Sequence, residues 1–326
     1  MIKKRVFASV LFVGALCLNS AGIAHAQDNY PNKSIRMVLG FPVGGGTDAI
    51  ARALAQKMGE ILGQSVIVEN KAGANGNIAG DIVAKSPADG YTILYNTSSI
   101  VISPSLYQNL SYNFDKDLTP ISLVANLPLV LLSSKQSGIN SGKEFLEKLK
   151  ANPGKLNYAS AGNGNVTHLL SLMMLEAAGG KAMHLPYRGE APALTDLAGG
   201  QVDFALSTAP AAIPLVRGDR VNGLAVSSIK RLENLPNIPT LSELMGKPLE
   251  LGAWSGIMAP ARTSPQIIAK LNSTIEKAMQ DKSLLAIFAK HSAEPRFMDT
   301  KQYAVFMKTE FERLGKIVRD NNVKID

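Results

Sequence analysis

Short runs of apolar and β-branched residues alternate along this chain with longer segments in which apolar residues recur every three or four positions. The short runs predict strands, and the longer segments predict amphipathic helices. In the first part of the chain the expected strands cover residues 34–39, 65–69 and 91–95, and the expected helices cover 49–62 and 76–85. Strand–helix–strand repetition is typical of a parallel sheet with helices on both faces. The pattern therefore predicts an α/β fold.

This rhythm breaks at two places. Residues 118–133 form a long apolar stretch that contains Pro120 and Pro128 and has no helical period. We interpret it as a strand that leaves one sheet and enters another. Residues 232–252 are rich in proline and lead into an expected strand at 253–258. Two such crossings predict two lobes, the second inserted into the first.

The segment between the crossings repeats the α/β pattern, with expected elements at 141–150, 156–160, 167–178, 182–186, 191–199 and 202–206. Two long helical patterns, at 265–280 and 300–321, close the chain. We therefore expect one lobe from residues 27–126 and 252–326, and a second lobe from residues 127–251.

The N-terminus has the pattern of a secretory signal peptide. A basic start at residues 3–5 precedes an apolar run at 6–18, and small residues follow at Ala24 and Ala26. The apolar run is shorter than the about 20 residues that a membrane-spanning helix needs. We expect residues 1–26 to be removed by cleavage after Ala26, which predicts a periplasmic protein.

Composition narrows the classes of partner. Cys17, the only cysteine, lies inside the expected signal peptide, so no disulfide is expected. The alternative is a lipoprotein that begins at a lipidated Cys17, although Leu16 stands where such a protein would need a small residue. Cleavage removes three basic residues and no acid, which lowers the net charge from +8 to +5 at pH 7. The remaining Lys and Arg residues are scattered, so we expect no binding to nucleic acid; the excess favours anionic solutes instead.

The strongest local signal is the loop FPVGGGTD at residues 41–48, between the first expected strand and helix. Ligands of open α/β sheets bind beyond the carboxyl ends of strands. Gly44, Gly45 and Gly46 let backbone N–H groups approach a ligand closely, and a helix N-terminus favours an anion. The alternative is a tight strand-to-helix turn without a ligand. No Gly-Lys-Ser/Thr follows, so the loop is not a P-loop.

A similar loop, SAGNGNVTH, occupies residues 160–168 of the second unit. Gly162 and Gly164 expose backbone donors, and polar side chains surround them. The first two glycines match a dinucleotide-binding fingerprint, but Thr167 stands at its third glycine position and no acid ends the following strand. We therefore expect no nucleotide and no other cofactor. Two half-sites of similar design predict a ligand held from both lobes.

Other candidates lie in loops at the same sheet edges. Arg188, just after an expected strand, has the chemistry for a bidentate pair with a carboxylate, or is a surface residue. Loops 73–76 and 97–99 are further candidates. His168 and His184 have no spacing typical of a metal site, so no metal is expected.

Catalytic motifs are absent from the sequence. It contains no Gly-x-Ser-x-Gly elbow and no His-Glu-x-x-His, and the expected mature chain has no cysteine nucleophile. We therefore expect a binding protein rather than an enzyme, with an exported hydrolase or lyase as the alternative class.

These segments together resemble the substrate-binding proteins of tripartite tricarboxylate transporters, also called Bug receptors. The resemblance spans nearly the whole chain. It rests on Tyr30-Pro31, FPVGGGTD at 41–48, Glu69-Asn70-Lys71, 73–76, Ser86 to Tyr91, 162–168, Tyr187-Arg188-Gly189, Gln201-Val202-Asp203, and Pro239-Thr240-Leu241 with Glu243.

The resemblance implies a two-lobed, Venus-flytrap fold of the type II periplasmic binding proteins, with a ligand cleft between the lobes. It also implies that one carboxylate is held by both loops, and that a monomeric receptor delivers it to permease subunits. A role in presenting the ligand to a sensor kinase is the alternative. The residues implied to hold that carboxylate are Phe41, Gly44, Gly45, Gly46, Asp48, Ser160, Gly162, Asn163, Thr167 and His168. The loops that contain Ala74, Asn75, Thr97 and Ser98 are implied to contact the distal end of the ligand, and Arg188 is the candidate given above on its own chemistry.

Overall fold

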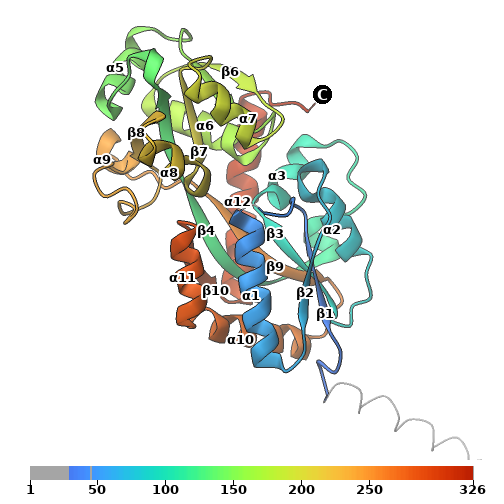
Figure 1. Cartoon of the computed structure of the whole chain (residues 1–326). Coiled ribbons are helices and arrows are strands. Elements are labelled where there is room, and N and C mark those ends of the chain that lie inside the picture. The colour runs from blue at the N-terminus through green and yellow to red at the C-terminus, as the bar shows by residue number, and fades with distance from the viewer. Residues whose placement is uncertain (1–28, 45, 326) are drawn as a thin grey trace, which may run out of the picture.

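The computed structural model describes residues 29–44 and 46–325. The expected signal peptide, its cleavage after Ala26, and Gly45 of the glycine loop lie outside the described residues. Figure 1 shows a two-lobed α/β molecule in which strands continue from one lobe into the other. Among the described residues, ten strands form one continuous, curled sheet.

The first lobe surrounds the part of the sheet in the order β2-β1-β3-β9-β4-β10. Strands β1, β2 and β3 are parallel, whereas β9 runs antiparallel to β3 and to β4, and β10 antiparallel to β4. The bounds are β1 Ile35–Leu39, β2 Val66–Asn70, β3 Thr92–Thr97, β4 Leu118–Ser134, β9 Gly252–Pro260 and β10 Glu294–Met298.

The second lobe surrounds the remaining strands. Strands β6, β5 and β7 are parallel, and β4 runs antiparallel between β7 and β8. The bounds are β5 Asn157–Ser160, β6 Met183–Pro186, β7 Phe204–Thr208 and β8 Val221–Val226.

Strand β4 is the main crossing between the lobes. It pairs with β9 as far as Pro128 and then, from Leu129 onward, with β7 and β8. This confirms the expectation that residues 118–133 form a strand that crosses between the two units, although the two units share one continuous sheet. Its 17 residues are almost entirely buried, which explains why they show neither alternation nor a helical period.

Helices cover both faces of the sheet in each lobe (Figure 1). In the first lobe α1, α10 and α11 pack on one face, and α2, α3 and α12 on the other. In the second lobe α5 and α6 cover one face, and α7 and α8 the other. The bounds are α1 Gly46–Leu62, α2 Asn77–Ala84, α3 Ser99–Leu106, α4 Phe114–Asp117, α5 Gly142–Ala151, α6 Val166–Ala178, α7 Glu190–Ala198, α8 Ala209–Arg217, α9 Leu241–Met245, α10 Pro265–Ala278, α11 Lys282–Lys290 and α12 Thr300–Asp320.

Alternation along β1 shows how the two faces are separated. Met37 and Leu39 are buried with α1 and α10, whereas Val38 between them is buried with α2 and α3 on the opposite side. Such a strand needs apolar residues on both faces, which is what its sequence supplies.

Helix α12 provides a third structural link between the lobes, in addition to strand β4 and the return of the chain into strand β9. Its C-terminal residues Leu314, Ile317 and Val318 are buried in the same cluster as Leu170 and Met174 of α6. Figure 1 shows α12 extending from the first lobe, so that the C-terminus lies near the second. The C-terminal helix therefore belongs to the cores of both lobes.

Candidate ligand-binding site

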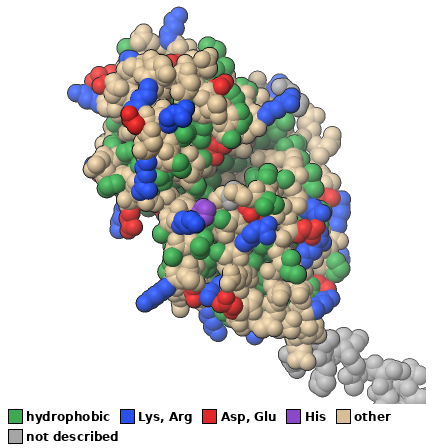
Figure 2. Space-filling model, in the orientation of Figure 1, with side chains coloured by type: hydrophobic (Ala, Val, Ile, Leu, Met, Phe, Trp, Pro, Cys, Tyr) green, Lys and Arg blue, Asp and Glu red, His purple; other side chains and the backbone are tan. Residues whose placement is uncertain are grey.

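The carboxyl ends of the parallel strands of the two lobes face each other. A methyl group on Gly46, at the start of α1, would lie 3.4 Å from Cγ of Pro210 at the start of α8. A methyl group on Gly164, in the β5–α6 loop, would overlap the side chain of Leu106 at the end of α3. Each glycine loop therefore contacts the opposite lobe, and Figure 2 shows a hollow between the two halves of the molecule.

In the first lobe, Asp48 organises the loop at residues 41–48. Its carboxylate is 4 % exposed, and it accepts a hydrogen bond of 3.0 Å from the Gly44 N–H and one of 2.9 Å from Asn70 Nδ2. Arg52 donates to the same carboxylate at 3.0 Å, and Asn70 Nδ2 also donates to the Phe41 carbonyl at 2.9 Å. The side chain of Asp48 therefore holds the loop itself.

The shifted pKa of Asp48 agrees with this structural role of its carboxylate. Burial works to raise the pKa of Asp48, but hydrogen bonds from Arg52, Asn70 and the Gly44 N–H, together with the Arg52 charge, hold that pKa below its ordinary value. Asp48 is therefore ionised at neutral pH and needs no cation from a ligand. Asn70, which sequence reasoning treated only as part of a motif, is the second member of this network.

The turn after β2 has an unusual backbone. Ala74 and Asn75 adopt φ values of 45° and 56°, in the left-handed region that residues with a side chain occupy rarely. Asn75, Phe41 and Thr97 line a cavity of about 10 Å³, which is enough for one water molecule. Strained turns of this kind are concentrated at functional sites, which suits a ligand contact here.

The loop after β3 divides into two parts. Thr97 Oγ1 lies 2.5 Å from Ser99 Oγ, at the cavity just described. Ser98 is instead 1 % exposed, and its N–H donates to the Trp254 carbonyl at 2.9 Å. The structure therefore places Thr97 toward the cavity and Ser98 against strand β9.

In the second lobe, most N–H groups of loop 160–168 already have a partner within the loop. The Gly162 N–H donates to Ser160 Oγ at 3.2 Å, and the Gly164 N–H donates to His168 Nδ1 at 3.1 Å. The Ala161 N–H likewise donates to Thr167 Oγ1 at 3.0 Å. Sequence reasoning expected free glycine donors here, but side chains of the same loop, one before and one after the glycines, accept hydrogen bonds from both glycine N–H groups.

Other donors of this loop remain available. Asn165 caps α6 by accepting from the Thr167 N–H at 3.0 Å. Within the described part of the chain, no hydrogen bond joins the N–H groups of Asn163, Val166 or His168 to an acceptor. These donors lie in the loop and the first turn of α6, where the helix dipole favours an anion.

The stacked imidazole rings of His168 and His184 pack against this loop. The rings of His168 and His184 lie 3.7 Å apart between centroids at an angle of 11°, and His184 also stacks on Tyr158 at 4.9 Å. His184 Nε2 lies 2.6 Å from Ser160 Oγ. Burial lowers the pKa of His184 to about 4, and burial together with the nearby His184 lowers that of His168 to about 3. Both rings are therefore neutral at pH 7.

The β6–α7 loop contributes the last candidates. Arg188 is exposed, and no ion pair joins it to an acid in the described ranges. Tyr187 is anchored, since its N–H donates to the Ser160 carbonyl at 3.0 Å and its hydroxyl to Asp196 at 2.8 Å. Sequence reasoning missed Glu190, whose carboxylate accepts from the Thr208 N–H at 2.7 Å. In the sequence alone, an acidic residue in the first turn of a helix indicates only a favourable interaction with the helix dipole.

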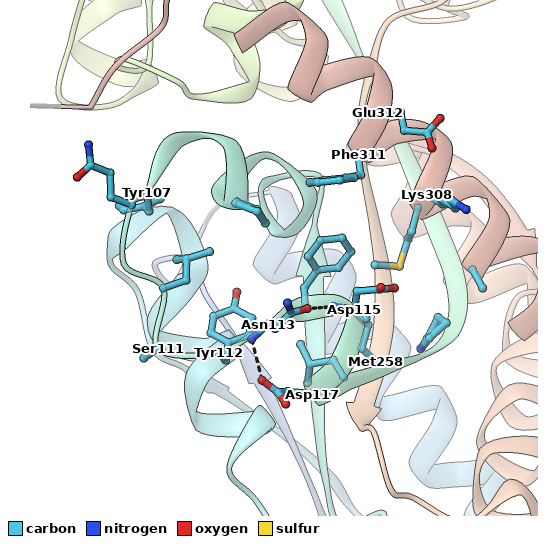
Figure 3. Close-up of a pocket in the computed structure, with 18 residues that line it drawn as sticks. Tyr107, Ser111, Tyr112, Asn113, Asp115, Asp117, Met258, Lys308, Phe311 and Glu312 are labelled. Carbon is cyan, nitrogen blue, oxygen red and sulfur yellow. Dashed lines mark hydrogen bonds between the residues drawn. The ribbon is translucent and has the colours of Figure 1, made fainter. Parts of the chain in front are cut away.

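A large cavity in the structure lies elsewhere. It has a volume of about 850 Å³ and lies between the α3–α4 loop and α12, where Tyr107, Tyr112 and Phe311 line it (Figure 3). None of the residues of the two glycine loops borders it. Among the described residues, no cluster of His, Cys, Asp and Glu could hold a metal ion, and no helix there is long and apolar enough to span a membrane.

Two α/β lobes, a continuous sheet and facing loops at the strand ends define a two-lobed periplasmic solute-binding protein. The chain belongs to the tripartite tricarboxylate transporter family of receptors, since residues 50–323 match the family described as "Tripartite tricarboxylate transporter family receptor". The proteins of this family are periplasmic binding proteins.

Individual proteins resemble the chain along nearly its whole length. Protein BugT of Bordetella pertussis is 36% identical over 320 residues, which cover 97% of this chain and 98% of BugT. An R. palustris protein solved with adipate superposes with a TM-score of 0.80 at 30% identity, covering 91% of this chain and 100% of that one. MatC from Rhodopseudomonas palustris, solved with bound malate, gives 0.74 at 29% identity over 89% and 100% of the two chains.

Proposed function

We propose that this receptor captures a small carboxylate in the periplasm and delivers it to the membrane permease subunits of a tripartite tricarboxylate-type transporter. The candidate ligands are di- and tricarboxylates, acidic amino acids and aromatic acids. The observation that carries the proposal is the meeting of the two loops across the lobes, at the contacts Gly46–Pro210 and Gly164–Leu106. The ligands named for the adipate- and malate-bound relatives support the same chemical class.

The proposed anchor is a carboxylate held by backbone donors of both loops rather than by a buried cation. In the second loop the N–H groups of Asn163, Val166 and His168 are the donors without an internal partner in the described structure. Charge-assisted bonds to neutral N–H groups can hold an anion without a countercharge. The remaining predicted binding residues stay part of the proposal, with Arg188 attracting an acid at the edge of the cleft.

We also propose that the lobes comprise residues 27–126 with 252–326, and residues 127–251, joined so that they can close on the ligand. The change of partner along β4 after Pro128 supports this division. The docking of α12 on α6 adds a third connection to the two that the sequence predicts. We expect the receptor to act as a monomer.

One pair of side chains, Ser160 and His184, resembles catalytic machinery, but its surroundings favour a binding role without catalysis. Ser160 Oγ and His184 Nε2 are 2.6 Å apart, as in a nucleophile–base pair. Ser160 is only 2 % exposed, and its hydroxyl also bonds the Gly162 backbone within the loop. We assign the pair to supporting the loop.

The test is a thermal-shift screen of the mature protein against mono-, di- and tricarboxylates, aromatic acids and acidic amino acids, followed by calorimetric titration. A true ligand at roughly 100 times its Kd should add about 2.7 kcal/mol to the free energy of unfolding. If no carboxylate raised the stability, the proposal would fail. Chemical conversion of the bound acid during prolonged incubation would contradict the non-catalytic role.

A further inference from the structure

The side chain of Glu190 places a carboxylate at the end of strand β7. The proposed binding of a ligand carboxylate by backbone N–H groups does not require this negative charge. Glu190 is the first residue of α7, and its side chain reaches across to the neighbouring strand. Oε1 accepts from Ser207 Oγ at 2.5 Å and from the Thr208 N–H at 2.7 Å, and Oε2 accepts from Thr208 Oγ1 at 2.9 Å. Three hydrogen bonds therefore fix the orientation of this carboxylate.

The position of Glu190 relates it to the candidate binding site. Thr208, its partner, lies two residues before Pro210, which meets Gly46 of the other lobe. Glu190 also lines a cavity of about 10 Å³ together with Ser160, Ala161 and Thr167 of the second glycine loop. The carboxylate therefore lies between that loop and the place where the first glycine loop contacts this lobe.

The charge of Glu190 is not neutralised by a neighbour. Within the described ranges it makes no ion pair, and all three of its hydrogen bonds come from uncharged donors. Arg188 lies on the same loop, but it is exposed and no ion pair joins the two. Oε2 accepts only one of these bonds, which leaves it able to accept another from a ligand or from a water in the cavity.

We propose that Glu190 determines specificity: it selects an acid whose second polar group is a hydrogen-bond donor, such as a hydroxyl or an ammonium group. A second carboxylate on this side of the ligand would face a fixed like charge, which costs affinity. A hydroxyl or ammonium group would instead satisfy the free acceptor on Oε2. This inference rests on the proposed carboxylate-receptor function and narrows its ligand class.

Three matched series of acids test the inference by calorimetric titration. Four-carbon and six-carbon linear acids, and para-substituted benzoates, each vary only in the group opposite the carboxylate: methyl, hydroxymethyl, aminomethyl or a second carboxylate. In the wild type we expect the hydroxymethyl or aminomethyl acid to bind at least about tenfold more tightly than its dicarboxylate counterpart.

Two neutral variants, Glu190→Gln and Glu190→Ala, should reduce that ratio to within about threefold. Glu312→Gln, which removes an exposed charge from α12, is the matched control and should leave the ratio unchanged. Because ratios are compared within one variant, a uniform loss of folded protein cancels, and melting curves without ligand identify a variant that does not fold.

An unchanged ratio in a folded neutral variant would overturn the role of Glu190. So would a wild type that binds the dicarboxylate as tightly as the hydroxymethyl acid. If no carboxylate of the wider screen binds the wild type, the receptor proposal itself fails, and this outcome is distinct from binding without the expected order.

Discussion

The indole N–H of Trp254 donates a hydrogen bond of 3.0 Å to the carboxylate of Glu310, which ties strand β9 to helix α12. Both residues are nearly buried, at 2 % and 6 % exposure. Arg313 donates to the same carboxylate at 2.8 Å, so that the buried charge is paired. Trp254 lies where the chain returns from the second lobe to the first, beside Asn126 of the crossing strand β4.

Trp254 should therefore report the closing of the lobes. It is the only tryptophan in the sequence, so all indole fluorescence comes from this position. We expect a bound acid to change the intensity or wavelength of its emission in proportion to the occupied fraction, as measured in a fluorescence titration. Identical emission from ligand-free and saturated protein would mean that this junction does not move.

Glu310→Leu should destabilise the protein by about 2 kcal/mol, because it leaves the indole N–H without an acceptor and Arg313 without its counter-ion. Glu310→Gln keeps an acceptor for the indole and should cost less. Denaturant unfolding of both variants gives the comparison. Equal losses would show that the charge, and not the hydrogen bond to Trp254, is what the site requires.

Replacement of Asp48 by Asn should weaken ligand binding and stability although the ligand does not need to touch this side chain. The folded-state pKa of Asp48 lies below its ordinary value, so its ionised form contributes stability above that ordinary value, and the contribution is lost as the pH falls through the folded-state pKa. The stability difference between wild type and variant should therefore shrink in strong acid. Chemical unfolding at several pH values measures it, and a difference independent of pH would assign it to packing.

The stacked histidines predict a loss of stability in mild acid. Their folded-state pKa values, about 3 for His168 and about 4 for His184, lie below the ordinary value of 6.5. Between pH 6.5 and about 4 the unfolded chain binds protons that the folded protein does not. The free energy of unfolding therefore decreases as the pH is lowered, by at most about 1.4 kcal/mol per pH unit for each histidine. Unfolding curves for wild type and His184→Gln compare the slopes. A variant with an unchanged slope would assign the acid sensitivity to other groups.

Gly164→Ala should impair closure. A methyl group there would overlap Leu106 of the other lobe, and Gly164 has a φ of 67°. Gly154→Ala is the matched control, because Gly154 has a φ of 76° with no atom within 4 Å of an added methyl group. We expect both variants to lose similar stability, about 1 kcal/mol, while only Gly164→Ala loses affinity. Adding Leu106→Ala should restore binding, and failure to do so would place the defect within the loop.

Periodicity predicted the strands of both parallel units to within one or two residues, because each is a short apolar run between glycine- or proline-rich turns. Helix α3 was missed, since Ile100, Val101 and Ile102 are buried on all sides and show no polar face. Helix α8 was missed because Pro210 and Pro214 interrupt its pattern. Strands β8 and β10 and helix α11 were also missed, since tertiary pairing and packing override weak local signals.

The sequence indicated which loops form the candidate site, but not the hydrogen bonds that hold these loops in place. Glycine spacing located both loops, yet the partners of their N–H groups depend on tertiary contacts that no local pattern contains. Asp48 and His168 hold their loops through their side chains, so a predicted binding residue can act by supporting its neighbours. Glu190 was missed because its partners, Ser207 and Thr208, lie on a strand that the chain reaches only after helix α7.

Helix α12 has a consequence for the order of folding. Ile317 and Val318 of this helix are buried in the same core as Val38 of strand β1 and Leu170 of helix α6. Contacts between residues so far apart in sequence form late and slowly. A chain truncated before Leu314 therefore lacks part of the core in both lobes, and we expect it to remain incompletely packed.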